Sequence, residues 1–149
     1  MRGVSQTEPL PATRRRRPLR GWLAAVGVLG LLVGAAFVWT APREDVAVPG
    51  RGASPKEVVI AYIDAVNARD FETANAIDAR PGSDLGRFSR PMRTHLVRME
   101  ETVTAGAAAH VLFTADFVGG DGTIDDGLWG YYLDRGSDGR WHITDAGVA

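Results

Sequence analysis

The sequence contains no cysteine in its 149 residues. This absence excludes disulfides, thiol catalysis, cysteine-based metal sites and a lipid-modified cysteine anchor. A folded domain in this chain must therefore be stabilised by its apolar core alone. Lysine is almost absent as well, since Lys56 is the only one beside sixteen arginines.

The sequence also lacks the short motifs of common catalytic and metal sites. It has no Ser-His-Asp motif, no phosphate-binding glycine loop and no dinucleotide fingerprint. The spacing of His95, His110 and His142 fits no local metal motif. Residues 121–127 are acidic and glycine-rich but lack the ligand pattern of a calcium loop, so we predict a hairpin loop there. We therefore expect no metal, no cofactor and no catalytic residue.

The charges are divided between the two ends of the chain. Residues 1–20 hold six arginines and one glutamate, for a net charge of +5, whereas residues 43–149 hold 11 basic and 17 acidic residues, for −6. Opposite signs on either side of an apolar segment indicate a membrane topology. Because an acidic domain is repelled by phosphate backbones, we expect no nucleic-acid binding outside the N-terminal tail.

An uncharged segment of twenty residues runs from position 21 to position 40. At about 1.5 Å per residue it would span about 30 Å, the thickness of the hydrocarbon core of a bilayer. Trp22 and Trp39 lie near its two ends, where amphipathic rings prefer the interface, and Pro42 ends the helix. We therefore predict a transmembrane helix at residues 21–41, with the lipid bilayer as its partner.

The flanking charge gives this segment a direction. The positive-inside rule places the N-terminus in the cytoplasm and the rest of the chain outside a single-pass plasma-membrane anchor. Residues 1–20 are polar and contain three prolines, so we expect a disordered tail. The arginines that set the orientation are Arg14, Arg15, Arg16 and Arg17.

Three other interpretations of the N-terminus stay open. A cleaved signal peptide would have a shorter apolar region, and Trp39-Thr40-Ala41 is a poor cleavage site, but cleavage after Ala41 would give a secreted protein. Residues 15–20 loosely resemble a twin-arginine export signal, with Pro18 where an aromatic residue is usual. A nucleic-acid-binding basic patch is superfluous beside a membrane span. An uncleaved signal-anchor fits the flanks best.

A linker and then a folded domain are predicted after the anchor. Residues 42–53 carry proline, glycine and charge without periodicity, which is typical of a linker. The domain, residues 54–149, opens with Ser54-Pro55-Lys56-Glu57, a capping box with proline at the first helical position. The apolar spacing predicts a helix that ends near Ala68. Asp70 can cap a second, short helix, which Pro81-Gly82 would end.

The period then changes to that of strands. Residues 93–103 alternate, with Val97, Met99 and Val103 on one face, although a helix fits this stretch too. Alternation is clearer at residues 108–118, 128–135 and 140–144, with a turn predicted at residues 119–122 and a hairpin turn at residues 137–139. Two helices followed by a meander of about four antiparallel strands is an α+β fold, with the first helix on the sheet.

Both ends of this domain resemble the nuclear-transport-factor-2-like superfamily, which includes SnoaL-like cyclases and steroid isomerases. Residues 54–74 (SPKEVVIAYIDAVNARDFETA) are similar to the opening helix of that family and its step into helix two. Residues 129–133 (WGYYL) and 138–147 (DGRWHITDAG) are similar to its last hairpin. The resemblance implies a cone-like domain with two helices packed on a curved sheet. The composition and the anchor together resemble actinobacterial members.

The resemblance also implies a pocket inside the cone. Its candidate lining residues are Tyr62, Phe113, Trp129, Tyr131 and Trp141. Isomerase-like members place a carboxylate base in this space, but no aspartate or glutamate lies at a strand centre on the apolar face here. We therefore expect these aromatic residues to fill the core.

The expected function is that of an extracytoplasmic interaction or accessory domain without evident catalysis. The outer sheet face is mixed polar and aromatic, which suits a homodimer or another protein partner. Its members are His110, Leu112, Thr114, Tyr132, His142 and Thr144. Two alternatives stay open: small apolar ligand binding or isomerase-like activity in the cone, and a subunit of a secretion, conjugation or Mce-type lipid-uptake complex.

Overall fold

The structure is a computed structural model that describes residues 19–41, 44–86, 89–90, 92–119 and 122–148. Within these ranges, side chains are not described for residues 19–25, 39–40 and 148. The tail arginines at positions 14–17 and part of the predicted turn at 119–122 lie outside the described residues, as do the side chains of Trp22 and Trp39. The chain divides into two units, residues 1–38 and 39–149.

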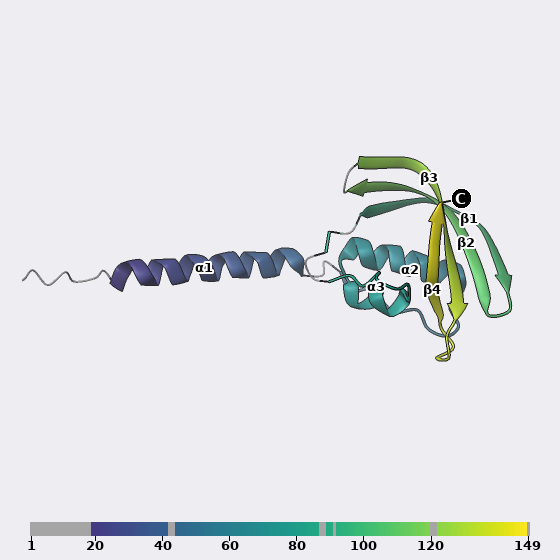
Figure 1. Ribbon diagram of the computed structural model, residues 1–149, viewed down its shortest axis with the longest axis horizontal. Helices are drawn as coiled ribbons and strands as arrows, with labels where there is room; N and C mark the ends of the chain where they lie inside the picture. The colour runs from purple at the N-terminus through teal and green to yellow at the C-terminus, as the bar shows by residue number, and fades with distance from the viewer. Residues whose placement is uncertain (1–18, 42–43, 87–88, 91, 120–121, 149) are drawn as a thin grey trace, which may run out of the picture. The chain divides into compact units, whose positions relative to one another are not determined.

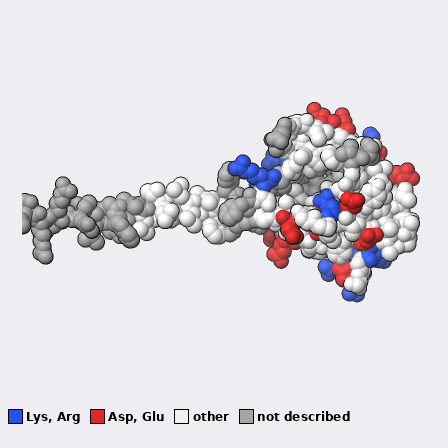
Figure 2. Space-filling model, viewed as in Figure 1, with Lys and Arg blue, Asp and Glu red and all other residues white. Residues whose placement is uncertain are grey.

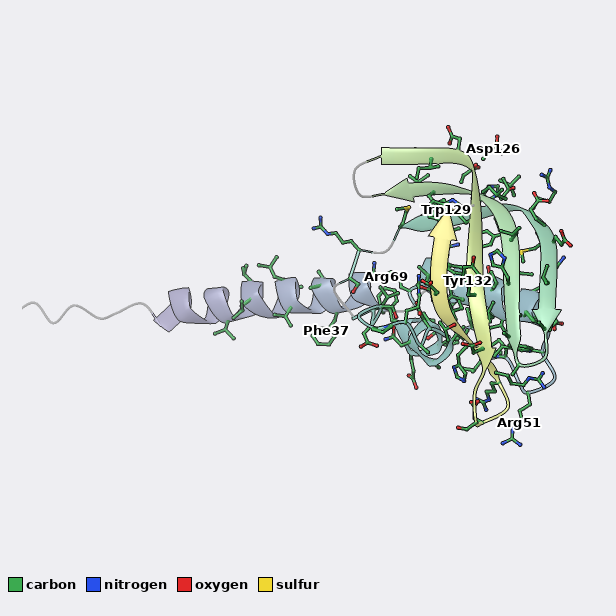
Figure 3. All side chains as sticks on the ribbon, turned by 45° about the vertical axis from the view of Figure 1, so that its right-hand side comes forward. Phe37, Arg51, Arg69, Asp126, Trp129 and Tyr132 are labelled. Carbon is green, nitrogen blue, oxygen red and sulfur yellow. The ribbon has the colours of Figure 1, made fainter. Side chains whose placement is uncertain are left out.

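The described residues of the first unit belong to one helix, α1 (Leu19–Thr40). The apolar side chains described between Val26 and Val38 are exposed, and this surface carries no charge in Figure 2. Phe37 is one of the side chains that project from it (Figure 3). Among the residues that the structure describes, no helix combines the length and the apolar character that a membrane span requires.

The second unit begins with two capped helices. α2 (Pro55–Ala68) starts at the predicted capping box, in which the Ser54 amide donates to Glu57 Oε2 at 2.6 Å and the Glu57 amide donates to Ser54 Oγ at 3.3 Å. It ends at Ala68, and the C-cap residue Arg69 adopts a left-handed conformation. α2 buries its apolar face in the core of the domain. That face consists of Val58, Val59, Tyr62, Ile63, Ala65 and Val66.

α3 (Phe71–Ile77) is capped by Asp70, as predicted, but it is shorter than predicted. It ends at Ile77, not at Pro81-Gly82, because the chain turns extended at Asp78. Asp78 forms an isolated parallel bridge with Ile143, and the Ala79 amide donates to the Ile143 carbonyl at 2.8 Å. A bond to a distant strand therefore ends this helix before the local proline signal does.

Four antiparallel strands form the sheet in the order β1-β2-β3-β4, so the predicted α+β class and meander are confirmed. The strands are β1 (Arg93–Ala105), β2 (Ala108–Gly119), β3 (Gly122–Arg135) and β4 (Trp141–Val148). Figure 1 shows that the sheet is strongly bent and that α2 and α3 lie against its concave side. The core between these layers includes Val111, Phe113, Ala115, Leu133 and Ile143.

Two predictions about the strands are wrong in detail. Residues 93–103 do form a strand, but Val97 and Val103 are 46% and 56% exposed, whereas Leu96 and Met99 pack on the core. Register shifts at Leu96/Arg98 and Met99/Thr102 break the alternation, since each inserted residue inverts the faces that follow. Residues 122–127 belong to β3 and are not a hairpin loop. Asp126, with φ 49°, lies next to the register shift there.

Within the second unit, the segment before α2 is bonded at Val46 to the start of α3. The Val46 amide donates to Asp70 Oδ2 at 2.9 Å, and Thr73 Oγ1 donates to the Val46 carbonyl at 2.9 Å. The Val46 side chain also packs against the core. The end of α2 and the start of α3 therefore fix the point at which the chain enters the domain.

Candidate functional site

Three of the five predicted pocket residues meet beneath α2. The rings of Tyr62 and Tyr131 form an edge-to-face pair with centroids 5.6 Å apart, and Phe113 lies 5.3 Å from Tyr131. Trp129 is the register partner of Phe113, and its ring packs 4.4 Å from Phe117. These rings fill the space that a ligand inside the sheet would need.

Trp141 does not join this group. It pairs with Arg135 at the far end of β3, and the Arg135 guanidinium lies over its ring at 4.9 Å. Neither of the two clefts described below is lined by Trp141 or by Phe113, Trp129 and Tyr131. Of the five predicted residues, Tyr62 alone lines one of these two clefts.

Beside Tyr62 lies an ion pair that the sequence interpretation missed. Arg80 holds Asp78 through two parallel bonds, with Nε at 2.9 Å from Oδ1 and Nη2 at 2.6 Å from Oδ2. The Asp78 side chain is 2% exposed and the Arg80 side chain is 25% exposed. A fork of this kind fixes the plane of the guanidinium as well as its position. The available signal was the spacing Asp78-Ala79-Arg80, which places both side chains on one face of extended chain.

The same guanidinium is held by two aromatic rings. Arg80 Nη2 donates to the Tyr62 hydroxyl at 3.1 Å, and the guanidinium carbon lies 5.9 Å from the Tyr62 centroid and 5.4 Å from that of Tyr131. Aromatic faces attract cations, most strongly where water is excluded. Arg80 therefore has one fixed orientation between α2, β3 and the segment after α3.

These contacts define the protonation states in the cluster. Burial raises the pKa of Tyr62, and the neighbouring Tyr131 and Asp78 raise it further, so this phenol stays neutral. Burial also raises the pKa of Asp78, but hydrogen bonds from Arg80 and Tyr62 outweigh it and hold the pKa below its usual value. Asp78 is therefore an anion paired with a cation and is not available as a general base at neutral pH.

A cleft of about 470 Å³ opens beside this cluster, and we call it the Arg80 cleft. Residues of the loop after α3 line it on one side, and Thr144 and Asp145, at the register shift between β3 and β4, line it on the other. Its lining residues are Tyr62, Arg80, Pro81, Gly82, Ser83, Leu85, Thr144 and Asp145.

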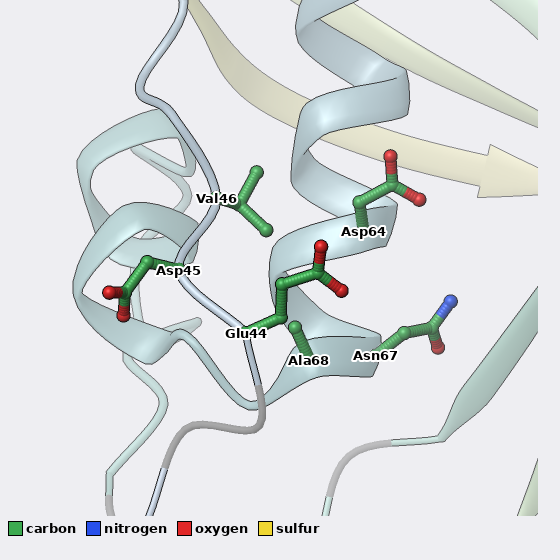
Figure 4. Close-up of a pocket in the computed structure, with 6 residues that line it drawn as sticks. All are labelled: Glu44, Asp45, Val46, Asp64, Asn67 and Ala68. Atoms are coloured by element: carbon green, nitrogen blue, oxygen red, sulfur yellow. The ribbon is translucent and has the colours of Figure 1, made fainter.

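A second cleft, of about 610 Å³, lies where the chain enters the domain (Figure 4). Glu44, Asp45 and Asp64 give it negative charge, and burial followed by the charge of Glu44 raises the pKa of Asp64. Among the described residues, no group of three or more histidines and carboxylates is arranged to hold a metal ion. This cleft is therefore an acidic surface hollow without a recognisable ligand geometry.

The convex face of the sheet carries an apolar surface. Val103, His110 and Tyr132 are register partners on three neighbouring strands and form one row across the sheet. The His110 and Tyr132 rings stack with centroids 4.1 Å apart and planes 5° apart. Tyr132 and the inward-facing Trp129 come from the same strand (Figure 3). We call this surface the outer patch: Val103, His110, Leu112, Leu128 and Tyr132.

The outer patch includes three of the residues predicted for the outer face. His110, Leu112 and Tyr132 lie close together there, and Tyr132 is 47% exposed. The predicted His142 instead contacts Asp138 at 3.2 Å, and Thr144 lines the Arg80 cleft. Gly130 is buried under the side chains of His110 and Leu112. The three histidines thus have separate partners, since His95 contacts Asp116.

Comparison of the chain with family models, with curated proteins and with solved structures finds no match. The resemblance to the nuclear-transport-factor-2-like superfamily therefore stays a prediction. The α+β fold, the Arg80 cleft and the outer patch are the features on which a functional proposal can be built.

Proposed function

We propose that this protein is a membrane-anchored extracytoplasmic interaction domain, without catalysis of its own, that self-associates through the outer patch. The single observation that carries the proposal is the row of Val103, His110 and Tyr132 on the sheet face opposite α2 and α3, in which Val103 and Tyr132 are exposed and His110 is half-buried. The opposite face is closed by α2 and α3. The domain therefore has two layers, the helices and the sheet, and burial of the outer patch would require a third layer on the other side of the sheet.

A second copy of this chain is the partner that best fits the patch. An isologous interface needs a surface that is complementary to itself, and here the side chains of the outer patch lie beside Gly147 on β4, where an added Cβ would have nothing within 4 Å. A two-fold axis along the strands would place the outer patch of one copy near Gly147 of the other. Anchoring both copies in one membrane would also raise their effective concentration.

The proposed anchor is the transmembrane helix predicted at residues 21–41. Its support is the uncharged run of twenty residues and the cluster of arginines just before it. An enclosing cone that binds a ligand finds less support, because the aromatic rings of Tyr62, Phe113 and Tyr131 pack against one another. Asp78, the buried carboxylate nearest to these rings, is already held by Arg80.

Single-cysteine crosslinking in native membranes tests the self-association. Because the chain has no cysteine, Leu112→Cys gives a unique reactive position in the outer patch, and Glu72→Cys on α3 is the matched control. With a short bis-maleimide we expect a dimer band for Leu112→Cys and little for Glu72→Cys. Adding Tyr132→Asp to Leu112→Cys should weaken that band. Equal crosslinking at both positions, or none at Leu112→Cys, would refute the dimer.

Topology needs a separate measurement. A membrane-impermeant maleimide applied to intact cells should label Ser137→Cys but not Ser5→Cys, and detergent should expose both. The mass of the mature chain then distinguishes an anchor from a cleaved signal peptide, since cleavage after Ala41 would remove residues 1–41. Labelling of Ser5→Cys in intact cells would contradict the proposed orientation.

A further inference from the structure

β1 lies at one end of the sheet order, so among the described strands it has a neighbour on one side and none on the other. The open side of such an edge strand presents N–H and C=O groups to which a strand of another chain can add. β1 extends over 13 residues, which is long for a strand at an edge. The contacts along this edge therefore decide whether the sheet can grow.

The side chain of Asn67 closes the edge at Thr94. Its Nδ2 donates to the Thr94 carbonyl at 2.6 Å, and its Oδ1 accepts from the Thr94 amide at 2.9 Å. An amide side chain that makes both bonds reproduces the donor and the acceptor of one residue in a neighbouring strand. Asn67 belongs to the last turn of α2, so this helix supplies the partner that the sheet lacks.

Lys56 closes the same edge from the first turn of α2. Its Nζ donates to the Glu100 carbonyl at 2.8 Å, in a partly buried contact. Lys56 is the single lysine of the chain beside sixteen arginines. Its ammonium is a compact donor on a flexible stem, which suits one carbonyl better than a planar guanidinium with five donors. Both ends of α2 are therefore bonded to the backbone of β1.

The charges of β1 favour a second copy of β1 as the strand that would add. Arg98 and Glu100 lie on either side of Met99, and Arg98 Nη2 is 2.6 Å from Glu100 Oε1, so both side chains project from one face. In an antiparallel pair of two copies centred on Met99, each Arg98 would lie opposite Glu100 of the other copy. Such a pair would need the Glu100 carbonyl as an acceptor, and Lys56 occupies this carbonyl.

We infer that Asn67 and Lys56 hold closed a strand-pairing surface on β1, and that its occupant, once both contacts are removed, is β1 of a second copy. This inference goes beyond the proposed function, because the outer patch is on the face of the sheet and this surface is on its edge. The two side chains restrict self-association to the face. Copies anchored in one membrane would meet at a raised effective concentration, at which an open edge would pair.

The test is sedimentation of the full-length protein in detergent, with Tyr132→Asp in every chain to remove association through the outer patch. Asn67→Ala with Lys56→Met leaves three backbone groups of β1 unpaired, and we expect it to strengthen self-association at least about tenfold. Asn75→Ala is the matched control, because Asn75 makes the same two bonds to the amide and carbonyl of Leu85, which belongs to a loop. It should destabilise the domain without strengthening association.

Charge reversal identifies the occupant. Adding Arg98→Glu to the chain that lacks both contacts should abolish the gain, since two glutamates would then face each other, and adding Glu100→Arg as well should restore it. Lys56→Met alone should give a smaller gain, and it decides the question if the double variant does not fold. Unchanged association after removal of these contacts, or an equal gain in Asn75→Ala, would overturn the inference. A gain that persists after Arg98→Glu would overturn the choice of β1 as the occupant.

Discussion

Gly130 shows how one missing side chain organises the outer patch. A Cβ at this position would lie 2.5 Å from His110 Nε2 and 3.2 Å from Leu112 Cδ2. His110 can stack on Tyr132 because the ring lies over a glycine. A side chain here would lift the imidazole and separate the two rings.

We expect Gly130→Ala to lower the free energy of unfolding by about 1–3 kcal/mol, the usual cost of overpacking a filled position. Urea denaturation measures the loss, and the ring-current shift of His110 protons should diminish with it. Gly147→Ala is the matched control, because it is the register partner of Gly130 on β4 and its added Cβ would have nothing within 4 Å. A similar loss in both variants would show that strand glycine in general, and not the His110 contact, sets the cost.

The Asp78–Arg80 pair joins two residues of the segment after α3 and lies beside Tyr62 of α2 and the ring of Tyr131 on β3. Asp78→Asn would leave the partly buried guanidinium without its charge partner, and we expect the free energy of unfolding to fall by about 3 kcal/mol. Chemical denaturation checks the value. The double variant Asp78→Asn with Arg80→Met should lose less than the two single variants together, since it removes both charges. Strict additivity would mean that the two side chains do not act as a pair.

At the scale of elements, the capping box should set the stability of α2. Ser54→Ala removes the side chain that accepts the Glu57 amide, and we expect the free energy of unfolding to fall by about 1 kcal/mol. Ser54→Thr, which retains the hydroxyl acceptor, is the control and should lose only a fraction of that amount. Urea denaturation of both variants measures the difference. Equal losses would show that the hydroxyl is not the stabilising group.

The elements that local chemistry specifies were predictable from the sequence. The start of α2 follows from Ser54-Pro55-Lys56-Glu57 and the start of α3 from Asp70, because a cap and its helix lie within a few residues. The elements that long-range pairing specifies were not. α3 ends early because Asp78 bonds to β4, and the faces of β1 invert where its register with β2 shifts. A single sequence does not report either pairing.

The same distinction explains the candidate site. Tyr62, Phe113 and Tyr131 were predictable as neighbours, because alternation places them on one side of the sheet and the helical period turns Tyr62 toward it. The Arg80 cleft was not, because it forms where the loop after α3 meets the register shift in β4. Charged residues in a loop are normally exposed to solvent. Asp78 is instead buried beside Ile143 of β4, which lies 65 residues further along the chain.

At the scale of the whole molecule, buried carboxylates make stability depend on pH. Asp70 and Asp78 connect the chain entry and α3 to the rest of the domain. Burial raises the pKa of each carboxyl, but hydrogen bonds outweigh it: those from Val46 and Thr73 for Asp70, and those from Arg80 and Tyr62 for Asp78. Both pKa values are therefore below the 3.8 of an unfolded aspartate.

A carboxyl whose pKa is lower in the folded state stabilises that state while it is ionised. Its contribution is complete at pH values above the unfolded pKa of 3.8, and it is lost as the pH falls through the lower, folded pKa. We therefore expect the urea midpoint to be flat from about pH 7 to pH 5 and to fall steeply below about pH 4. Asp78→Asn should start from a lower midpoint and show a shallower acid slope, because its amide does not titrate. An acid slope as steep as that of the unaltered protein would assign the transition to other carboxyls and not to the Asp78–Arg80 pair.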